Sequence, residues 1–110
     1  MFDLLDSEGY PTIEFLENIK NAKVNIIEIF STIADAFHSS GYGKAKWSNN
    51  NKRLKLITGG WSGNEDIKSA MFENVFISIC WCASVRGGVS IWDLREIREK
   101  EIKDLQNEYK

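Results

Sequence analysis

Hydrophobic residues recur at helical spacing in two segments near the N-terminus. The first follows Pro11-Thr12, a pair that suits a helix start with Thr12 as the N-cap. We expect its inner face to carry Ile13, Leu16 and Ile19, with Phe15 beside them. The second begins at Asn25 and has a stronger apolar stripe, made of Ile26, Ile29, Phe30, Ile33, Ala34 and Phe37. Ser39-Ser40-Gly41 is typical of a helix end, so the pattern predicts two amphipathic helices.

The next two segments alternate between charged and apolar residues, as half-buried strands do. Residues 42–48 and 52–58 both show this alternation, and the Asn49-Asn50-Asn51 turn between them predicts a hairpin. The hairpin is basic, because it holds Lys44, Lys46, Lys52, Arg53 and Lys55. The commoner interpretation is that these cations keep the strands from pairing with other chains. The alternative is a binding surface for an acidic partner.

A second pair of strands is expected further along the chain. Residues 75–84 are nearly all apolar or small on both faces, which favours a central strand, although the pattern alone does not separate it from a buried helix. Arg86-Gly87-Gly88 then forms a turn, and residues 89–92 return as a short strand. The sequence therefore predicts an α+β fold. In it, two N-terminal helices pack on an antiparallel sheet of two hairpins joined by a short helix.

The last segment is predicted to be a charged helix. Asp93 and Glu96 form a capping pair, and the helix Leu94–Tyr109 that follows has only a narrow apolar stripe that includes Ile97, Ile102 and Leu105. Such a helix either lies along its own domain or pairs with another copy, and we expect a homodimer through Leu94–Tyr109. Residues 1–110 are thus one domain, with 94–110 as a helical extension.

A glycine-rich corner separates the two hairpins. Gly59-Gly60 ends the second strand, and Ser62 and Glu65 have the S-x-x-E spacing of a capping box that starts a helix over 63–74. Three interpretations remain open. The corner is a recognition site, a nucleophile elbow with Ser62 as nucleophile and His38 as its base, or only a turn in which Trp61 packs on the core. A phosphate site is disfavoured, because Glu65 and Asp66 bring negative charge to the helix start.

Composition limits the partners and the compartment. The net charge of -2 argues against nucleic acid, and no apolar run has the ~20 residues of a membrane helix. The acidic N-terminus lacks the pattern of a signal peptide, so the cytoplasm is expected. Both cysteines lie in Cys80-Trp81-Cys82 and are predicted to be reduced and buried. With His38 as the only histidine, we expect no metal site and no cofactor.

The run Thr58-Gly59-Gly60-Trp61-Ser62-Gly63-Asn64-Glu65, followed by Phe76, Trp81, Ser84 and Arg86-Gly87-Gly88, resembles a group of small uncharacterised phage and bacterial proteins. The resemblance covers residues 10–92, and it implies a small accessory protein, such as an inhibitor of a host defence system.

Our leading hypothesis is a non-catalytic protein that binds a host protein or a small nucleotide-like ligand by stacking on Trp61. The predicted binding residues are Gly59, Gly60, Trp61, Ser62, Asn64, Glu65, Arg86 and Gly87. We expect the corner and the Arg86 turn to meet in space. The alternatives are a small serine hydrolase using Ser62 and a structural or oligomerisation subunit.

Overall fold

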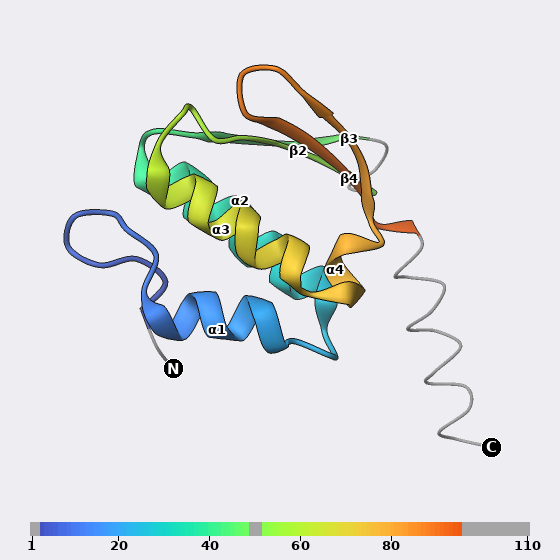
Figure 1. The fold of residues 1–110 in the computed structure, drawn as a ribbon, viewed down its shortest axis with the longest axis horizontal. Helices are drawn as coiled ribbons and strands as arrows, with labels where there is room; N and C mark the ends of the chain where they lie inside the picture. Colours follow the sequence, from blue (N-terminus) through green and yellow to red (C-terminus); the bar gives the residue numbers. More distant parts are fainter. Residues whose placement is uncertain (1–2, 49–51, 96–110) are drawn as a thin grey trace.

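Four antiparallel strands form one sheet, and three long helices lie on one side of it (Figure 1). The structure is a computed structural model that describes residues 3–48 and 52–95. The strand order is β1-β2-β4-β3, so each hairpin supplies one central and one edge strand. The elements are α1 (Ile13–Asn21), α2 (Ile26–Ser40), β1 (Lys44–Ser48), β2 (Arg53–Ile57), α3 (Ser62–Glu73), α4 (Val75–Ser78), β3 (Trp81–Val85) and β4 (Val89–Asp93).

The helices form two layers beneath the sheet. Figure 1 shows α2 and α3 next to the sheet and α1 on their far side. Trp92 of β4 is fully buried, and its ring lies 5.9 Å from that of Phe30 in α2 and 5.1 Å from that of Phe72 in α3, measured between centroids. The core therefore joins the central strand β4 to both inner helices, α2 and α3. The predicted α+β class with two N-terminal helices and two hairpins is confirmed.

The alternation read from the sequence gives the strand faces correctly. Leu54 and Leu56 of β2 are fully buried, whereas Lys55 between them is exposed. Ala45 of β1 points to the same core, and Lys44 and Lys46 lie on the exposed side. Successive side chains of a strand point to opposite faces. The buried face of each strand can therefore be predicted from the residues of that strand alone.

The prediction of a central strand over residues 75–84 is wrong. Val75–Ser78 is the short helix α4, and only Trp81–Val85 forms a strand, at the edge of the sheet. The Asn74 side chain accepts a hydrogen bond from Phe76 N at 2.9 Å, which starts the helix. Its amide also donates to the carbonyl oxygens of Ile19 and Ala22, at 2.7 and 2.8 Å. Asn74 therefore connects the start of α4 to the end of α1. This long-range contact favours a helix over residues whose apolar pattern had predicted a strand.

Three smaller expectations also fail. Ile13 is 76% exposed, because the inner face of α1 is centred on Phe15 and Ile19. Cys80 is buried as predicted, but Cys82 is exposed, at a register shift of the edge strand. Leu94 was predicted as the first residue of the helical extension, but it is fully buried and its N–H donates to Lys52 O at 2.7 Å, so it belongs to the core of the domain.

The expected dimer helix lies largely outside the described residues. Ile97, Ile102 and Leu105 all belong to that part, so the homodimer stays a prediction. Among the residues that the structure does describe, no helix is long and apolar enough to span a membrane.

Candidate functional site

Three loops meet at the end of the sheet where β2 ends. They are the N-terminal loop with Tyr10, the connection from α2 to β1 with Tyr42, and the glycine-rich corner with Trp61. The Trp61 ring lies 4.8 Å from Tyr10 and 4.8 Å from Tyr42 between centroids, with interplanar angles of 41° and 29°. We call these three rings the aromatic corner. Trp61 is half-buried, Tyr10 is 38% exposed and Tyr42 is 59% exposed.

Glycines let the backbone approach the aromatic corner closely. A Cβ on Gly59 would lie 1.8 Å from the carbonyl oxygen of Tyr42, and a Cβ on Gly63 would lie 2.6 Å from the Trp61 ring. Real Cβ atoms do not come this close to another heavy atom, so a side chain at either position would displace the loop. Gly59, a predicted binding residue, and Gly63, which was not predicted as one, therefore allow the close packing of this corner. Gly60 and Gly87 play no such part, because a Cβ on either would meet nothing within 4 Å.

Hydrogen bonds from the backbone to side chains hold the two tyrosine loops in place. The carboxylate of Asp6 accepts from the backbone N–H groups of Glu8 and Tyr10, both at 2.9 Å. Tyr42 N donates to Ser40 Oγ at 3.3 Å, after α2 has ended at Gly41 with φ +78°. The backbone N–H of each tyrosine thus donates to a side-chain oxygen that closes the turn. This hydrogen bond fixes the position from which the tyrosine ring extends.

A buried polar network lies beneath the rings. Asn64 is fully buried, and its amide donates to Thr58 O at 3.1 Å and to Ser40 Oγ at 3.4 Å. Thr58 Oγ1 donates to Glu65 Oε1 at 2.8 Å, and Lys68 lies 3.3 Å from Glu65 Oε2. Asn64 therefore links the corner to the end of α2. Its Oδ1 is buried with no hydrogen-bond partner among the described residues.

The predicted capping box is not formed. Helix α3 begins at Ser62, Trp61 is its N-cap, and no side chain caps it. The Glu65 carboxylate accepts from Thr58 Oγ1 instead of reaching back to the start of the helix. A threonine hydroxyl delivered by the preceding strand competes with the local bond, which the spacing of Ser62 and Glu65 could not reveal.

The Arg86 turn meets the corner, as expected. Thr58 N donates to Gly88 O at 3.1 Å, and a Cβ on Gly88 would lie 2.1 Å from Thr58 Oγ1. Gly87 and Arg86 are exposed, and no ion pair of Arg86 is found within residues 3–48 and 52–95. The predicted binding residues thus share one end of the sheet. Trp61 faces the tyrosines, whereas Glu65 faces the second turn.

Tyr10 and Tyr42 were not predicted as site residues. Tyr10 directly precedes Pro11, and Tyr42 lies between Gly41 and Gly43. An aromatic residue inside a glycine turn has no core to pack on within its own element, which is the local signal that could have been used. Only the tertiary structure shows that both rings reach Trp61.

The hydrolase interpretation gains no geometric support. Ser62 is exposed, and no hydrogen bond joins it to His38 within the part of the chain that the structure describes. A serine nucleophile is activated by a base within hydrogen-bond reach.

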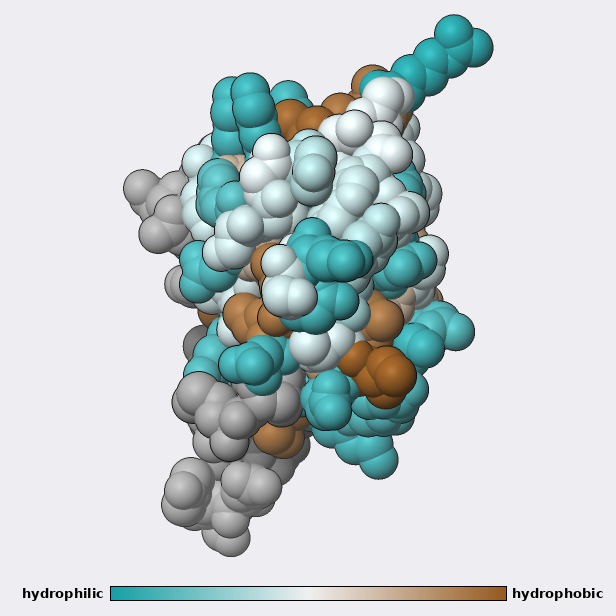
Figure 2. Space-filling model, turned by 90° about the vertical axis from the view of Figure 1, so that its left-hand side faces the viewer, coloured by the Kyte–Doolittle hydropathy of each residue, from teal (hydrophilic) through white to brown (hydrophobic). Residues whose placement is uncertain are grey.

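Figure 2 views the molecule from the end that carries the aromatic corner. A broad area of near-neutral hydropathy covers much of this view, with hydrophilic residues around it and smaller hydrophobic patches between them. Tyrosine, tryptophan, serine and glycine have such intermediate hydropathy, and many residues of the three loops are of these types.

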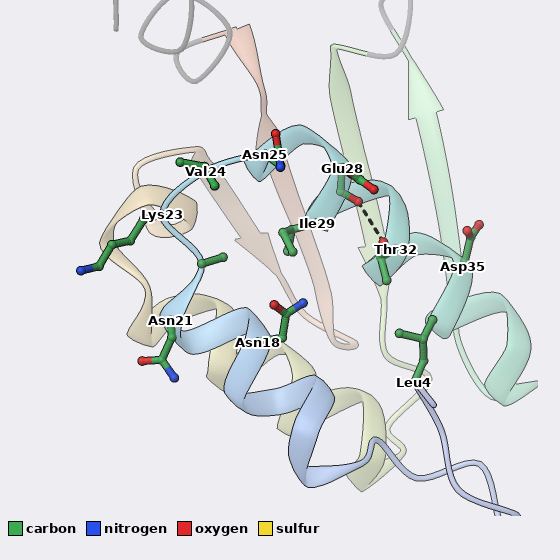
Figure 3. Close-up of a pocket in the computed structure, with 11 residues that line it drawn as sticks. Leu4, Asn18, Asn21, Lys23, Val24, Asn25, Glu28, Ile29, Thr32 and Asp35 are labelled. Atoms are coloured by element: carbon green, nitrogen blue, oxygen red, sulfur yellow. Dashed lines mark hydrogen bonds between the residues drawn. The ribbon is translucent and has the colours of Figure 1, made fainter. Parts of the chain in front are cut away.

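A separate groove lies between α1 and α2 (Figure 3). It has a volume of about 740 Å³, and Asn18 of α1 faces Ile29 and Thr32 of α2 across it. Lys23, Glu28 and Asp35 also line it, so both signs of charge are present. None of the predicted binding residues lies in this groove. Its mixed charges indicate no particular ligand.

Comparison of the chain with protein-family models, with curated proteins and with solved structures finds no match in any of the three. The resemblance to phage and bacterial proteins therefore stays a prediction.

Proposed function

We propose that this chain is a non-catalytic binding protein whose aromatic corner contacts a protein partner. The observation that carries the proposal is the packing of Tyr10 and Tyr42 on Trp61, with Tyr42 still 59% exposed. Tyrosine and tryptophan are enriched in the energetically dominant parts of interfaces. Because their rings are already held by each other and by closed turns, they lose little conformational freedom on binding.

A protein surface fits the aromatic corner better than a nucleotide-like ligand does. Stacking of a base on Trp61 needs an open ring face. This ring already packs on two tyrosines, and it lies so close to Gly63 that a Cβ there would overlap it. Glu65 and Asp66 would also lie near the phosphates of such a ligand. We take the partner to be a host protein, with inhibition of a host defence system as the resulting activity. Both rest on the resemblance of the TGGWSGNE run.

The proposal is tested by affinity capture from a bacterial lysate with the wild type and two matched variants. Tyr42→Ser removes an exposed ring of the aromatic corner, and Ile13→Ser removes a more exposed apolar side chain on α1. We expect the wild type and Ile13→Ser to enrich the same protein, and Tyr42→Ser to lose about tenfold or more of that enrichment. Quantitative mass spectrometry of the captured proteins provides the measurement.

The captured partner is then purified and tested for direct binding. Hydrogen exchange should slow at residues 40–43 and 59–62 when the two proteins are mixed. Equal capture by Tyr42→Ser and the wild type would overturn the proposal, as would labelling of Ser62 by a fluorophosphonate in the folded protein. Trp61→Ala is a poorer test, because its ring supports both tyrosines and its loss would disturb the fold of the corner.

A further inference from the structure

The face of the sheet that points away from α1, α2 and α3 has an unusual composition. Two neighbouring cross-strand rows make up most of it, with partners set by the strand register. The first row is Lys44, Ile57, Val89 and Val85, and the second is Lys46, Lys55, Ile91 and Ala83. We call these eight residues the open face. No helix among the described residues lies over it (Figure 1).

The open face is divided into a basic and an apolar half. Lys44, Lys46 and Lys55 are exposed on β1 and β2, whereas β4 and β3 contribute only aliphatic side chains. An antiparallel sheet with one solvated face ordinarily alternates apolar residues inward with polar residues outward. The first hairpin follows this rule. The second does not, because Val89 and Ile91 point outward and are only half-buried, and Val85 is 56% exposed.

The charge on this side of the sheet is positive, although the chain as a whole carries -2. None of the three lysines forms an ion pair within residues 3–48 and 52–95. The nearest carboxylate in the sheet, that of Asp93, is already bound by Arg95 and lies 3.7 Å from Arg53. An apolar strip beside unpaired cations is typical of a surface that binds a complementary partner.

We infer that the open face is a second interaction surface, and that its partner is a protein segment with an apolar stripe flanked by Asp or Glu residues. The aliphatic half would cover the stripe, and the three lysines would pair with the carboxylates. The open face is distinct from the aromatic corner and consists of different residues. An experiment can therefore overturn either proposal without affecting the other.

Two other occupants fit the open face less well. Nucleic acid binds sheets by stacking bases on outward aromatic rings. Here the strand tryptophans do not point outward. Trp92 is buried, Trp81 pairs with it across the strands, and Trp47 pairs with the buried Leu54. A second copy of the chain would bring one lysine-rich face against another, and like charges across an interface oppose association.

The test uses defined probes and the full chain. A synthetic amphipathic peptide carries leucines on one face and glutamates on its flanks, and a matched peptide replaces the glutamates with lysines. A single-stranded oligonucleotide is the third probe. Fluorescence anisotropy gives affinities, and amide chemical shifts locate the contact. We expect the acidic peptide alone to bind, with shifts centred on β2 and β4.

Matched variants separate the open face from general electrostatics. Lys55→Glu should weaken binding of the acidic peptide about tenfold, and Ile91→Thr should weaken it by a similar factor. Lys23→Glu makes the same charge change in the connection between α1 and α2 and should leave binding unchanged. Lys55→Gln repeats the first test more mildly, and thermal unfolding checks that each variant folds.

Three results would overturn the inference. One is tighter binding of the oligonucleotide than of the acidic peptide. Another is an affinity for the acidic peptide that neither Lys55→Glu nor Ile91→Thr changes. The last is light scattering that shows a wild-type dimer converted to a monomer by Lys55→Glu, because the occupant would then be a second copy.

Discussion

Gly59 and Gly60 are neighbours with nearly the same backbone conformation, but their surroundings differ. Both have positive φ, +69° and +75°. A Cβ on Gly59 would collide with the carbonyl oxygen of Tyr42, whereas a Cβ on Gly60 would meet nothing within 4 Å. At the residue scale, Gly60 therefore serves only the turn. Gly59 also allows the glycine-rich corner to contact the loop that carries Tyr42.

Alanine at each position should separate these two effects. Gly60→Ala should lower the free energy of unfolding by about 1 kcal/mol, because an L-residue is strained at positive φ. Gly59→Ala should lower it by about 3 kcal/mol, since the overlap with a backbone atom adds to the same strain. Chemical denaturation of both variants measures the difference. Equal losses would show that contact with the Tyr42 loop contributes nothing.

At the scale of single elements, α1 and α3 begin in different ways. Thr12 caps α1, with its Oγ1 accepting from Phe15 N at 3.2 Å, as the sequence predicts. Ser62 caps nothing, because α3 starts one residue earlier than the capping-box spacing requires. The helix is held instead by Asn64 and Glu65, which form hydrogen bonds with Thr58, the residue directly after β2.

Two hydroxyl deletions should therefore differ in cost. Thr12→Ala should destabilise the protein by about 1 kcal/mol, which is typical of a lost N-cap. Ser62→Ala should change stability by no more than about 0.5 kcal/mol, because it removes an exposed hydroxyl without a cap bond. Urea midpoints at constant m-value compare the two variants. A larger loss for Ser62→Ala would mean that this serine does cap α3 in solution.

At the scale of the whole molecule, one carboxylate at the end of β4 joins several parts. Asp93 accepts hydrogen bonds from the Arg95 side chain and from Arg95 N, and Arg53 of the neighbouring strand lies 3.7 Å away. The hydrogen bond from the Arg95 side chain is the main cause that lowers the pKa of Asp93 to about 2 from an ordinary 3.8, and partial burial opposes it. Folding thus favours the ionised carboxylate.

The free energy of unfolding should consequently fall as the pH becomes acidic. Because the pKa of Asp93 is lower in the folded state, its contribution is present above pH 3.8 and is lost as the pH falls toward 2. Asp93→Asn should cost about 1 kcal/mol at neutral pH, less than the full shift implies, because solvent screens the exposed Arg95.

Urea unfolding at several pH values measures this contribution. Asp93→Asn should flatten the acid limb of the profile, and Arg95→Gln should act in the same direction by removing the charged guanidinium. Identical profiles for wild type and Asp93→Asn would contradict the assignment.

Local pattern was sufficient for much of the fold. The stripes of α2 and the alternation of β1 and β2 each lie within one element, so neighbouring residues encode which side is buried. Gly41 and Thr12 mark helix ends for the same reason, since their bonds run to residues a few positions away. The meeting of the corner with the Arg86 turn was also predicted, but in the structure it depends on the pairing of β2 with β4, which joins the two hairpins.

The tertiary structure decided those features that depend on residues far apart in the chain. The apolar run from Val75 became a helix and an edge strand, because Asn74 bonds to the end of α1 more than fifty residues earlier. Tyr10 and Tyr42 became site residues only because two loops close on Trp61. The division of the open face also needs strand register, which no single strand contains. The sequence determines which face of an element is apolar, whereas packing determines what that face meets.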